Sequence, residues 1–292
     1  PPAWNAGLAG AIAGLAMLLV QLPLTPGSTP RPARTAAPGG GTLGAIPRAA
    51  DDDDPALPIA ATALASALLG RTIDERPLIF VVTGTDAGVG ATTVACLLAE
   101  ELARRGRRTL LVDGHLAAPG VGTRYRDRVG VPEDPEAAST VAWLRDPEGT
   151  EGVASVDLAE GGNLDVVVQP RPTRLAPGSK EAFFAGLPAA IERWSGYQTI
   201  VIDSGPILAF EDTRWLVPVA TGALLVERSD GWDERRIRAA HERIREAGGS
   251  LLGLVENDAP PDAPRGPSSE GEAHEVERLR VVRHDGPTPE RG

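Results

Sequence analysis

Residues 84–93, which read GTDAGVGATT, form a glycine-rich segment of the kind that binds phosphate groups. Such a loop works because consecutive backbone N–H groups curl around phosphate oxygens, while the following helix presents the positive end of its dipole. Glycines permit the backbone conformations that this curl requires. The predicted nucleotide-contacting residues are Gly84, Gly88, Val89, Gly90, Ala91, Thr92 and Thr93.

The loop departs from the usual pattern at Ala91. In that pattern a lysine follows the last glycine and reaches the β- and γ-phosphates, and the next Ser or Thr binds Mg²⁺. Here Thr92 is retained but the lysine is not, and Asp86 makes the loop still less attractive to anions. Losing one charge-assisted contact costs about 1.5–3 kcal/mol, or about ten- to a hundredfold in affinity. We therefore expect ATP with Mg²⁺ to bind weakly or not at all.

Two aspartates complete a candidate metal site. Asp113 follows the apolar run 109–112, and Asp203 follows the run 199–202. An Asp at a strand end is often only a loop or helix cap. However, the carboxyl ends of parallel strands meet at one edge of a sheet, beside the phosphate loop. We expect Asp113 and Asp203 to be the catalytic residues and, with Thr92, to hold Mg²⁺.

A parallel α/β sheet is needed to position these residues. Six short apolar runs are typical of buried parallel strands: 78–82, 109–112, 164–168, 199–202, 223–226 and 251–255. Helical patterns alternate with them at 92–105, 180–194 and 233–247. Because crossovers between parallel strands are right-handed, the sequence predicts an α/β fold with a mainly parallel sheet and helices on both faces.

An uncharged apolar run near the start of the chain, residues 6–22, predicts a membrane helix. Its length of about 17 residues is at the short limit for crossing a hydrocarbon core. Arginines follow the run and no charge precedes it, so the positive-inside rule places the rest of the chain in the cytoplasm. We expect residues 1–24 to be a transmembrane helix in the inner membrane. The alternative is a buried or signal-like apolar helix in a cytoplasmic protein.

Two segments beside the predicted domain, residues 77–258, have the composition of unfolded chain. Residues 25–58 are rich in Pro, Gly, Ala and Thr, and residues 259–292 are rich in Pro, Asp, Glu, Gly and Ser. Neither can bury enough apolar area to fold. We expect a flexible linker over 25–76, with a short helix at 59–69, and a disordered tail over 259–292.

Charge and cysteine content exclude several classes of protein. The chain has 40 acidic and 29 basic residues and a net charge of -11. Binding nucleic acid requires clustered Lys and Arg, so we expect no nucleic-acid partner. The single cysteine, Cys96, excludes a disulfide framework and a Cys-rich metal site.

Taken in this order, the motifs resemble those of the bacterial tyrosine kinases of capsule and exopolysaccharide assembly. That family is related to the partition and septum-positioning ATPases, whose phosphate loops are also deviant. The resemblance covers about residues 78–258 and is carried by GVGATT at 88–93, VDGHLAAP at 112–119, VIDSGP at 201–206 with Asp212, and LVEN at 254–257. It implies a P-loop NTPase-like three-layer sandwich with ATP and Mg²⁺ as cofactors, and it places Asn257 near the adenine. It further implies membrane proteins of polysaccharide chain-length control and export as partners, together with self-association.

Several features that the resemblance implies are missing. Besides the lysine, the second aspartate of the middle motif is replaced by His115, and the basic positions after it are alanines at 117–118. The family's C-terminal tyrosine cluster has no counterpart, because the only tyrosines are Tyr125 and Tyr197, within the predicted domain.

We therefore expect a degenerate tyrosine-kinase-like domain that regulates or scaffolds envelope-polysaccharide synthesis, with weak or no ATP turnover. One alternative is an active autokinase or ATPase that uses another cation, such as Lys180 or an arginine of a neighbouring subunit. A partition or positioning ATPase is the other alternative.

Overall fold

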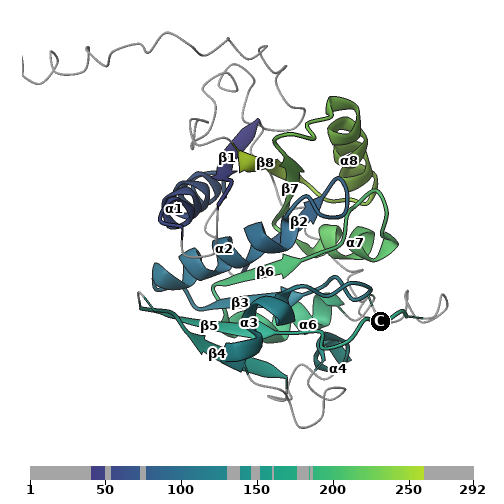
Figure 1. Ribbon diagram of the computed structural model, residues 1–292. Helices are drawn as coiled ribbons and strands as arrows, with labels where there is room; N and C mark the ends of the chain where they lie inside the picture. The colour runs from purple at the N-terminus through teal and green to yellow at the C-terminus, as the bar shows by residue number, and fades with distance from the viewer. Residues whose placement is uncertain are drawn as a thin grey trace, which may run out of the picture. The chain divides into compact units, whose positions relative to one another are not determined.

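The computed structural model describes residues 41–49, 54–72, 77–129, 139–145, 152–159, 161–175, 184 and 187–259. The strands are β1 (Thr42–Pro47), β2 (Leu78–Gly84), β3 (Thr109–Asp113), β4 (Val153–Asp157), β5 (Asn163–Val167), β6 (Thr199–Asp203), β7 (Gly222–Arg228) and β8 (Leu251–Ala259). They form one eight-stranded sheet in the order β1-β8-β7-β2-β6-β3-β5-β4 (Figure 1). Every neighbouring pair is parallel except β4 and β5.

Helices cover both faces of this sheet (Figure 1). The helices are α1 (Ala56–Leu69), α2 (Ala91–Arg104), α3 (Val121–Val129), α4 (Thr140–Arg145), α6 (Leu187–Arg193), α7 (Glu211–Leu216) and α8 (Glu234–Glu246). The buried core consists of two clusters, one on each face. Helices α1, α2 and α3 contribute to the first cluster, and α4, α6, α7 and α8 to the second. The predicted α/β fold, with a mainly parallel sheet between two helical layers, is confirmed.

The central strand β2 explains why such strands appear as continuous apolar runs. Phe80 and Val82 belong to the first core cluster, whereas Ile79 and Val81 belong to the second. Consecutive side chains of a strand point to opposite faces, and here both faces are covered by helices. All seven residues of β2 are therefore buried.

The six strands expected from apolar runs are all present, but the structure adds two that the sequence pattern did not indicate. Strand β4 is antiparallel to β5, and of its five residues only Val156 is buried. A strand with so few buried residues has no continuous apolar run. Sequence periodicity alone could not distinguish it from a loop.

Strand β1 corrects the linker predicted over 25–76. It pairs in parallel with β8, and its side chains Leu43 and Ile46 are fully buried in the first core cluster. Helix α1, at the place where the sequence predicts a short helix, buries Leu64 and Leu68 in the same cluster. The folded unit therefore includes β1 and α1, which precede residue 77.

The predictions for the two ends of the chain fall outside the described residues. These are the transmembrane helix predicted at 1–24 and the tail predicted over 259–292, of which only Ala259, the last residue of β8, is described. Among the residues that the structure does describe, no helix combines the length and apolar character needed to cross a membrane.

Candidate nucleotide-binding site

The predicted phosphate loop connects β2 to α2. Gly84 is the last residue of β2, and α2 starts at Ala91 with Gly90 as its N-cap. Gly88 and Gly90 have φ angles of 77° and 90°, in the left-handed region that glycine adopts without steric cost. The loop backbone therefore depends on glycine where the sequence places it, and it directs the N-terminus of a 14-residue helix toward any anion bound there.

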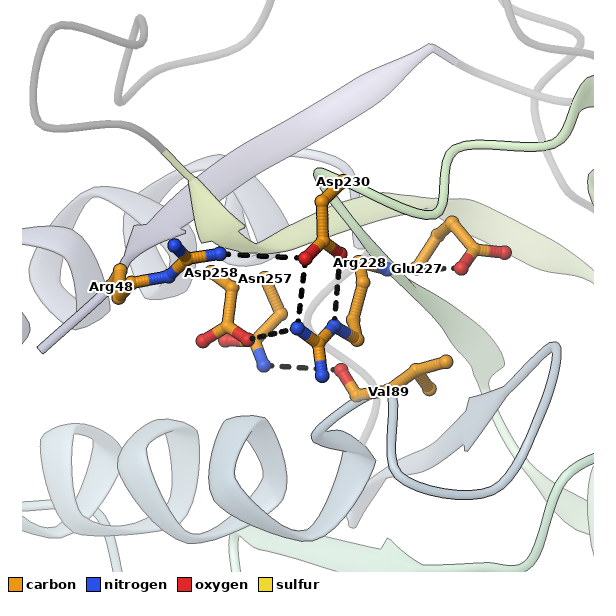
Figure 2. A network of polar contacts seen from close by, with 7 residues as sticks. All are labelled: Arg48, Val89, Glu227, Arg228, Asp230, Asn257 and Asp258. Atoms are coloured by element: carbon orange, nitrogen blue, oxygen red, sulfur yellow. Dashed lines mark hydrogen bonds and ion pairs between the residues drawn. The ribbon is translucent and has the colours of Figure 1, made fainter.

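Asn257 of β8 fastens this loop to the sheet. Its Nδ2 donates a hydrogen bond of 3.0 Å to the carbonyl of Val89 (Figure 2). A Cβ added to Gly90 would lie 2.0 Å from the same nitrogen, so only glycine fits beneath the amide. The structure thus gives Asn257 a direct contact with the loop. Its proximity to an adenine stays a prediction.

Next to Asn257, a group of charged side chains joins three segments of the chain (Figure 2). Arg228 donates two hydrogen bonds to Asp230, of 3.0 and 2.9 Å, and pairs with Asp258 at 3.4 Å. Arg48, just after β1, reaches the same Asp230 at 3.5 Å. Exposed pairs of this kind contribute little stability each, but together they connect the β1 edge to the end of β7 and to β8, which carries Asn257.

Asp113 and Asp203 lie side by side, as the sequence predicts. They are register partners at the ends of β3 and β6, and both are fully buried. The Oδ2 of Asp113 accepts a hydrogen bond of 3.2 Å from the backbone N–H of Val121. Among the described residues, Oδ1 of Asp113 and both carboxylate oxygens of Asp203 have no partner of good hydrogen-bond geometry. Such orphaned buried oxygens are rare and costly unless an ion or water satisfies them.

Burial sets the protonation of this pair. It raises the pKa of Asp113 to about 7 against the opposing effect of backbone N–H groups. It raises the pKa of Asp203 well above its usual range, and the neighbouring Asp113 charge adds to the rise, while the Thr92 hydroxyl lowers it. Two such carboxylates require protons or a cation between them.

The third predicted metal ligand, Thr92, belongs to the same cluster. Its hydroxyl lowers the pKa of Asp203 through a side-chain hydrogen bond. Its Oγ1 lies so close to Gly120 that a Cβ added there would be 3.1 Å away. The described residues include no group of three or more His, Cys, Asp or Glu side chains able to bind a metal. A hydroxyl and orphaned carboxylate oxygens nonetheless fit Mg²⁺, which takes oxygen ligands and keeps several waters.

His115, which stands in place of an aspartate, is packed beside this cluster. Its ring lies edge-on to Phe210, with centroids 4.7 Å apart. Burial lowers the pKa of His115, and the nearby Asp212 acts in the opposite direction. The imidazole is therefore mainly neutral at pH 7 and supplies no fixed charge at this place.

One charged residue at the loop was not anticipated from the sequence. The guanidinium of Arg236, in α8, lies 2.6 Å from the carboxylate of Asp86 and donates a 3.2 Å hydrogen bond to the Thr85 carbonyl. Arg236 follows Asp86 by 150 residues and sits among many charged residues of an amphipathic helix. No local pattern could single it out. Lys180, the cation considered from the sequence, lies outside the described residues.

The chain is similar in sequence to proteins named tyrosine-protein kinases. No family model matches the chain. Over 194 residues it is 27% identical to tyrosine-protein kinase YwqD of Bacillus subtilis, covering 64% of this chain and 74% of that protein. Over 183 residues it is 24% identical to tyrosine-protein kinase CpsD of Streptococcus pneumoniae, covering 63% and 77%.

Solved structures show the same fold. The kinase domain of the Escherichia coli tyrosine kinase ETK superposes with a TM-score of 0.62 at 19% identity, covering 78% of this chain and 94% of that domain. A plasmid partition protein of Borrelia burgdorferi gives a TM-score of 0.50 at 16% identity, covering 65% and 79%. The chain is therefore a distant homologue of the bacterial tyrosine kinases, built on a P-loop NTPase-like α/β fold that it shares with the plasmid partition protein.

Proposed function

We propose that this chain is a degenerate tyrosine-kinase-like domain that binds ATP with Mg²⁺ weakly and turns it over slowly or not at all. The observation that carries the proposal is Ala91 at the first position of α2, at the end of an otherwise assembled loop. A neutral, short side chain stands where a phosphate-binding cation is expected. His115, mainly neutral, adds no charge at the neighbouring carboxylates.

In this proposal the remaining groups divide the binding between them. The backbone N–H groups of residues 88–93 and the N-terminus of α2 receive the phosphates. Thr92, Asp113 and Asp203 hold Mg²⁺, which when bound offsets phosphate charge and orients the terminal phosphate. Because the pKa of Asp113 is raised to about 7, protons compete with the metal at neutral pH.

The biological role that we propose is to regulate or scaffold envelope-polysaccharide synthesis from the cytoplasmic side of the inner membrane. Membrane proteins of polysaccharide chain-length control and export are the proposed partners, and self-association is proposed as well. The motif resemblance supports this role, and so does the distant homology to proteins named tyrosine-protein kinases.

A nucleotide titration of the protein beside its Ala91→Lys variant tests the proposal. We expect weak binding of ATP with Mg²⁺ to the native protein, and a gain of about ten- to a hundredfold in the variant if the added cation completes the pocket. ATP hydrolysis and autophosphorylation are measured on the same samples. Submicromolar affinity with clear autophosphorylation of the native protein would contradict the proposal.

One observation favours the alternative of an active ATPase or kinase that uses another cation. Arg236 brings a guanidinium to the loop within the same chain. If that cation suffices for catalysis, the native protein hydrolyses ATP at a measurable rate, and Arg236→Gln abolishes the hydrolysis.

A further inference from the structure

Arg236 contacts the phosphate loop from α8, the helix that follows β7 in the chain. Its Nη2 lies 2.6 Å from Oδ2 of Asp86 and 3.2 Å from the Thr85 carbonyl oxygen. Both contacts use the same amino group. A guanidinium has five N–H donors, so Nε and Nη1, which form no other bond to the described residues, remain able to bind a second anion.

The position of Arg236 is held by the fold. Asp233 caps α8 by accepting hydrogen bonds from the backbone N–H groups of Arg235 and Arg236, so the first turn of α8 is fixed beside the loop. The Arg236 side chain is 42% exposed and that of Asp86 is 54% exposed. A ligand entering the loop from solvent can therefore reach both.

Three carboxylates surround the guanidinium of Arg236. Asp86, Glu227 and Asp233 all act on its guanidinium, and Asp86 is the strongest of them. Glu227 is itself held by the Thr85 hydroxyl. Asp86 is thus an anion on a loop whose backbone is built to receive anions, and Arg236 neutralises it.

We propose that Arg236 is the phosphate-binding cation of this site, in place of the missing lysine, and that Asp86 is an internal competitor for it. A phosphate group in the loop takes the place of Asp86 on the guanidinium. The planar fork of arginine suits phosphate oxygens and bonds them in pairs. This inference rests on the proposed weak nucleotide binding and explains its weakness, because the phosphate must displace an existing ion pair.

Titration of four proteins with ATP and Mg²⁺, and separately with pyrophosphate, tests the inference: the native chain, Arg236→Gln, Asp86→Asn and the double variant. We expect Arg236→Gln to weaken binding about tenfold, the value of one charge-assisted contact. We expect Asp86→Asn to strengthen it about two- to fivefold, as for an exposed charge. In the Arg236→Gln background the gain from Asp86→Asn becomes smaller, because no guanidinium is left to release.

Two further variants separate a specific contact from a general loss of charge. Arg235→Gln removes one positive charge from the adjacent, exposed position of the same helix, and we expect it to change affinity less than twofold. Arg236→Lys keeps the charge but loses the fork, so its affinity falls between those of the native chain and Arg236→Gln. Circular dichroism of every variant confirms that the fold is intact.

The outcomes distinguish this inference from the proposed function. If the native chain binds nucleotide and Arg236→Gln behaves like Arg235→Gln, Arg236 is not the phosphate-binding cation and only this inference fails. An equal gain from Asp86→Asn in both backgrounds also overturns it. If neither the native chain nor Asp86→Asn binds ATP or pyrophosphate, both the inference and the proposed nucleotide binding fail.

Discussion

The side-chain amide of Asn257 donates a hydrogen bond of 3.0 Å to the carbonyl of Val89, across 168 residues of sequence. Strand β8 thereby holds the phosphate loop at its turn into α2. Both groups are buried, so the contact is made without competition from water. A loop held in this way is restrained at the residue that precedes the N-cap of α2.

Replacing Asn257 with Ala is expected to destabilise the protein by about 1–3 kcal/mol, because the buried Val89 carbonyl loses its partner. Urea denaturation measures the change. The control is Asn163→Ala, since Asn163 is exposed and, within the described part of the chain, its side-chain amide bonds only to Asp157 at 3.2 Å. An Asn257→Ala variant no less stable than the control would show that the contact contributes nothing to the fold.

Substituting alanine for Gly90 is expected to cost more than the same change at Gly88. Both glycines have positive φ, which an L-residue adopts at a cost of about 1–2 kcal/mol. Only at Gly90 would the new Cβ also meet the Asn257 amide, whereas nothing lies within 4 Å at Gly88. In thermal unfolding, Gly90→Ala should therefore melt below Gly88→Ala. Combining Gly90→Ala with Asn257→Ala removes the clash. The double variant should therefore be destabilised by less than the sum of the two single variants.

The buried carboxyl of Glu227 predicts a pH dependence of stability. Its pKa is raised by burial, against hydrogen bonds from Thr85 and Arg228. A group with a raised pKa binds its proton more tightly in the folded state. Its contribution to stability is therefore present below the unfolded pKa and is lost as pH rises through the folded pKa. Above pH 4.5, the free energy of unfolding of the native chain should fall with rising pH by at most about 1.4 kcal/mol per pH unit on account of this group. In Glu227→Gln this part of the fall should be absent.

Urea unfolding between pH 4.5 and 7 measures this dependence. Glu246→Gln is the matched control, because Glu246 lies at the exposed end of α8 and its ion pair with Arg243 is 3.8 Å long. Parallel curves for the native chain and Glu227→Gln across this range would contradict the expected proton uptake.

Strand β1 provides a test of whether the folded unit extends beyond the predicted domain of residues 77–258. Leu43 is fully buried in the first core cluster. Leu43→Ala is therefore expected to cost about 2–5 kcal/mol in the free energy of unfolding, as for other buried leucines. Ile59 in α1 is 57% exposed, so Ile59→Ala should change stability by less than about 0.5 kcal/mol. If both variants unfold at the same urea concentration, β1 does not belong to the cooperative unit.

Local patterns predicted the elements that bury both faces. Runs such as the one in β2 are apolar because helices cover each side, and this leaves an unmistakable signal in the sequence. Strands β1 and β4 lie at the two edges of the sheet, where each pairs with one strand only among the residues that the structure describes. Strand β1 reads TLGAIP, in which Gly and Pro interrupt the apolar run, and β4 buries only one of its five residues. Neither therefore leaves a continuous apolar run, and their pairing depends on partners far away in the chain.

The sequence alone revealed three features of the site: the glycines at 84, 88 and 90, Ala91 in place of a lysine, and the aspartates at strand ends. It could do so because backbone conformation and strand termini depend on neighbouring residues. Only the tertiary structure decided that Asn257 holds the loop, that the sheet edge shared by Asp113 and Asp203 is fully buried, and that Arg236 brings a guanidinium to Asp86. These relationships join residues 90 to 168 positions apart, and no local propensity encodes which side chains the folded sheet brings together.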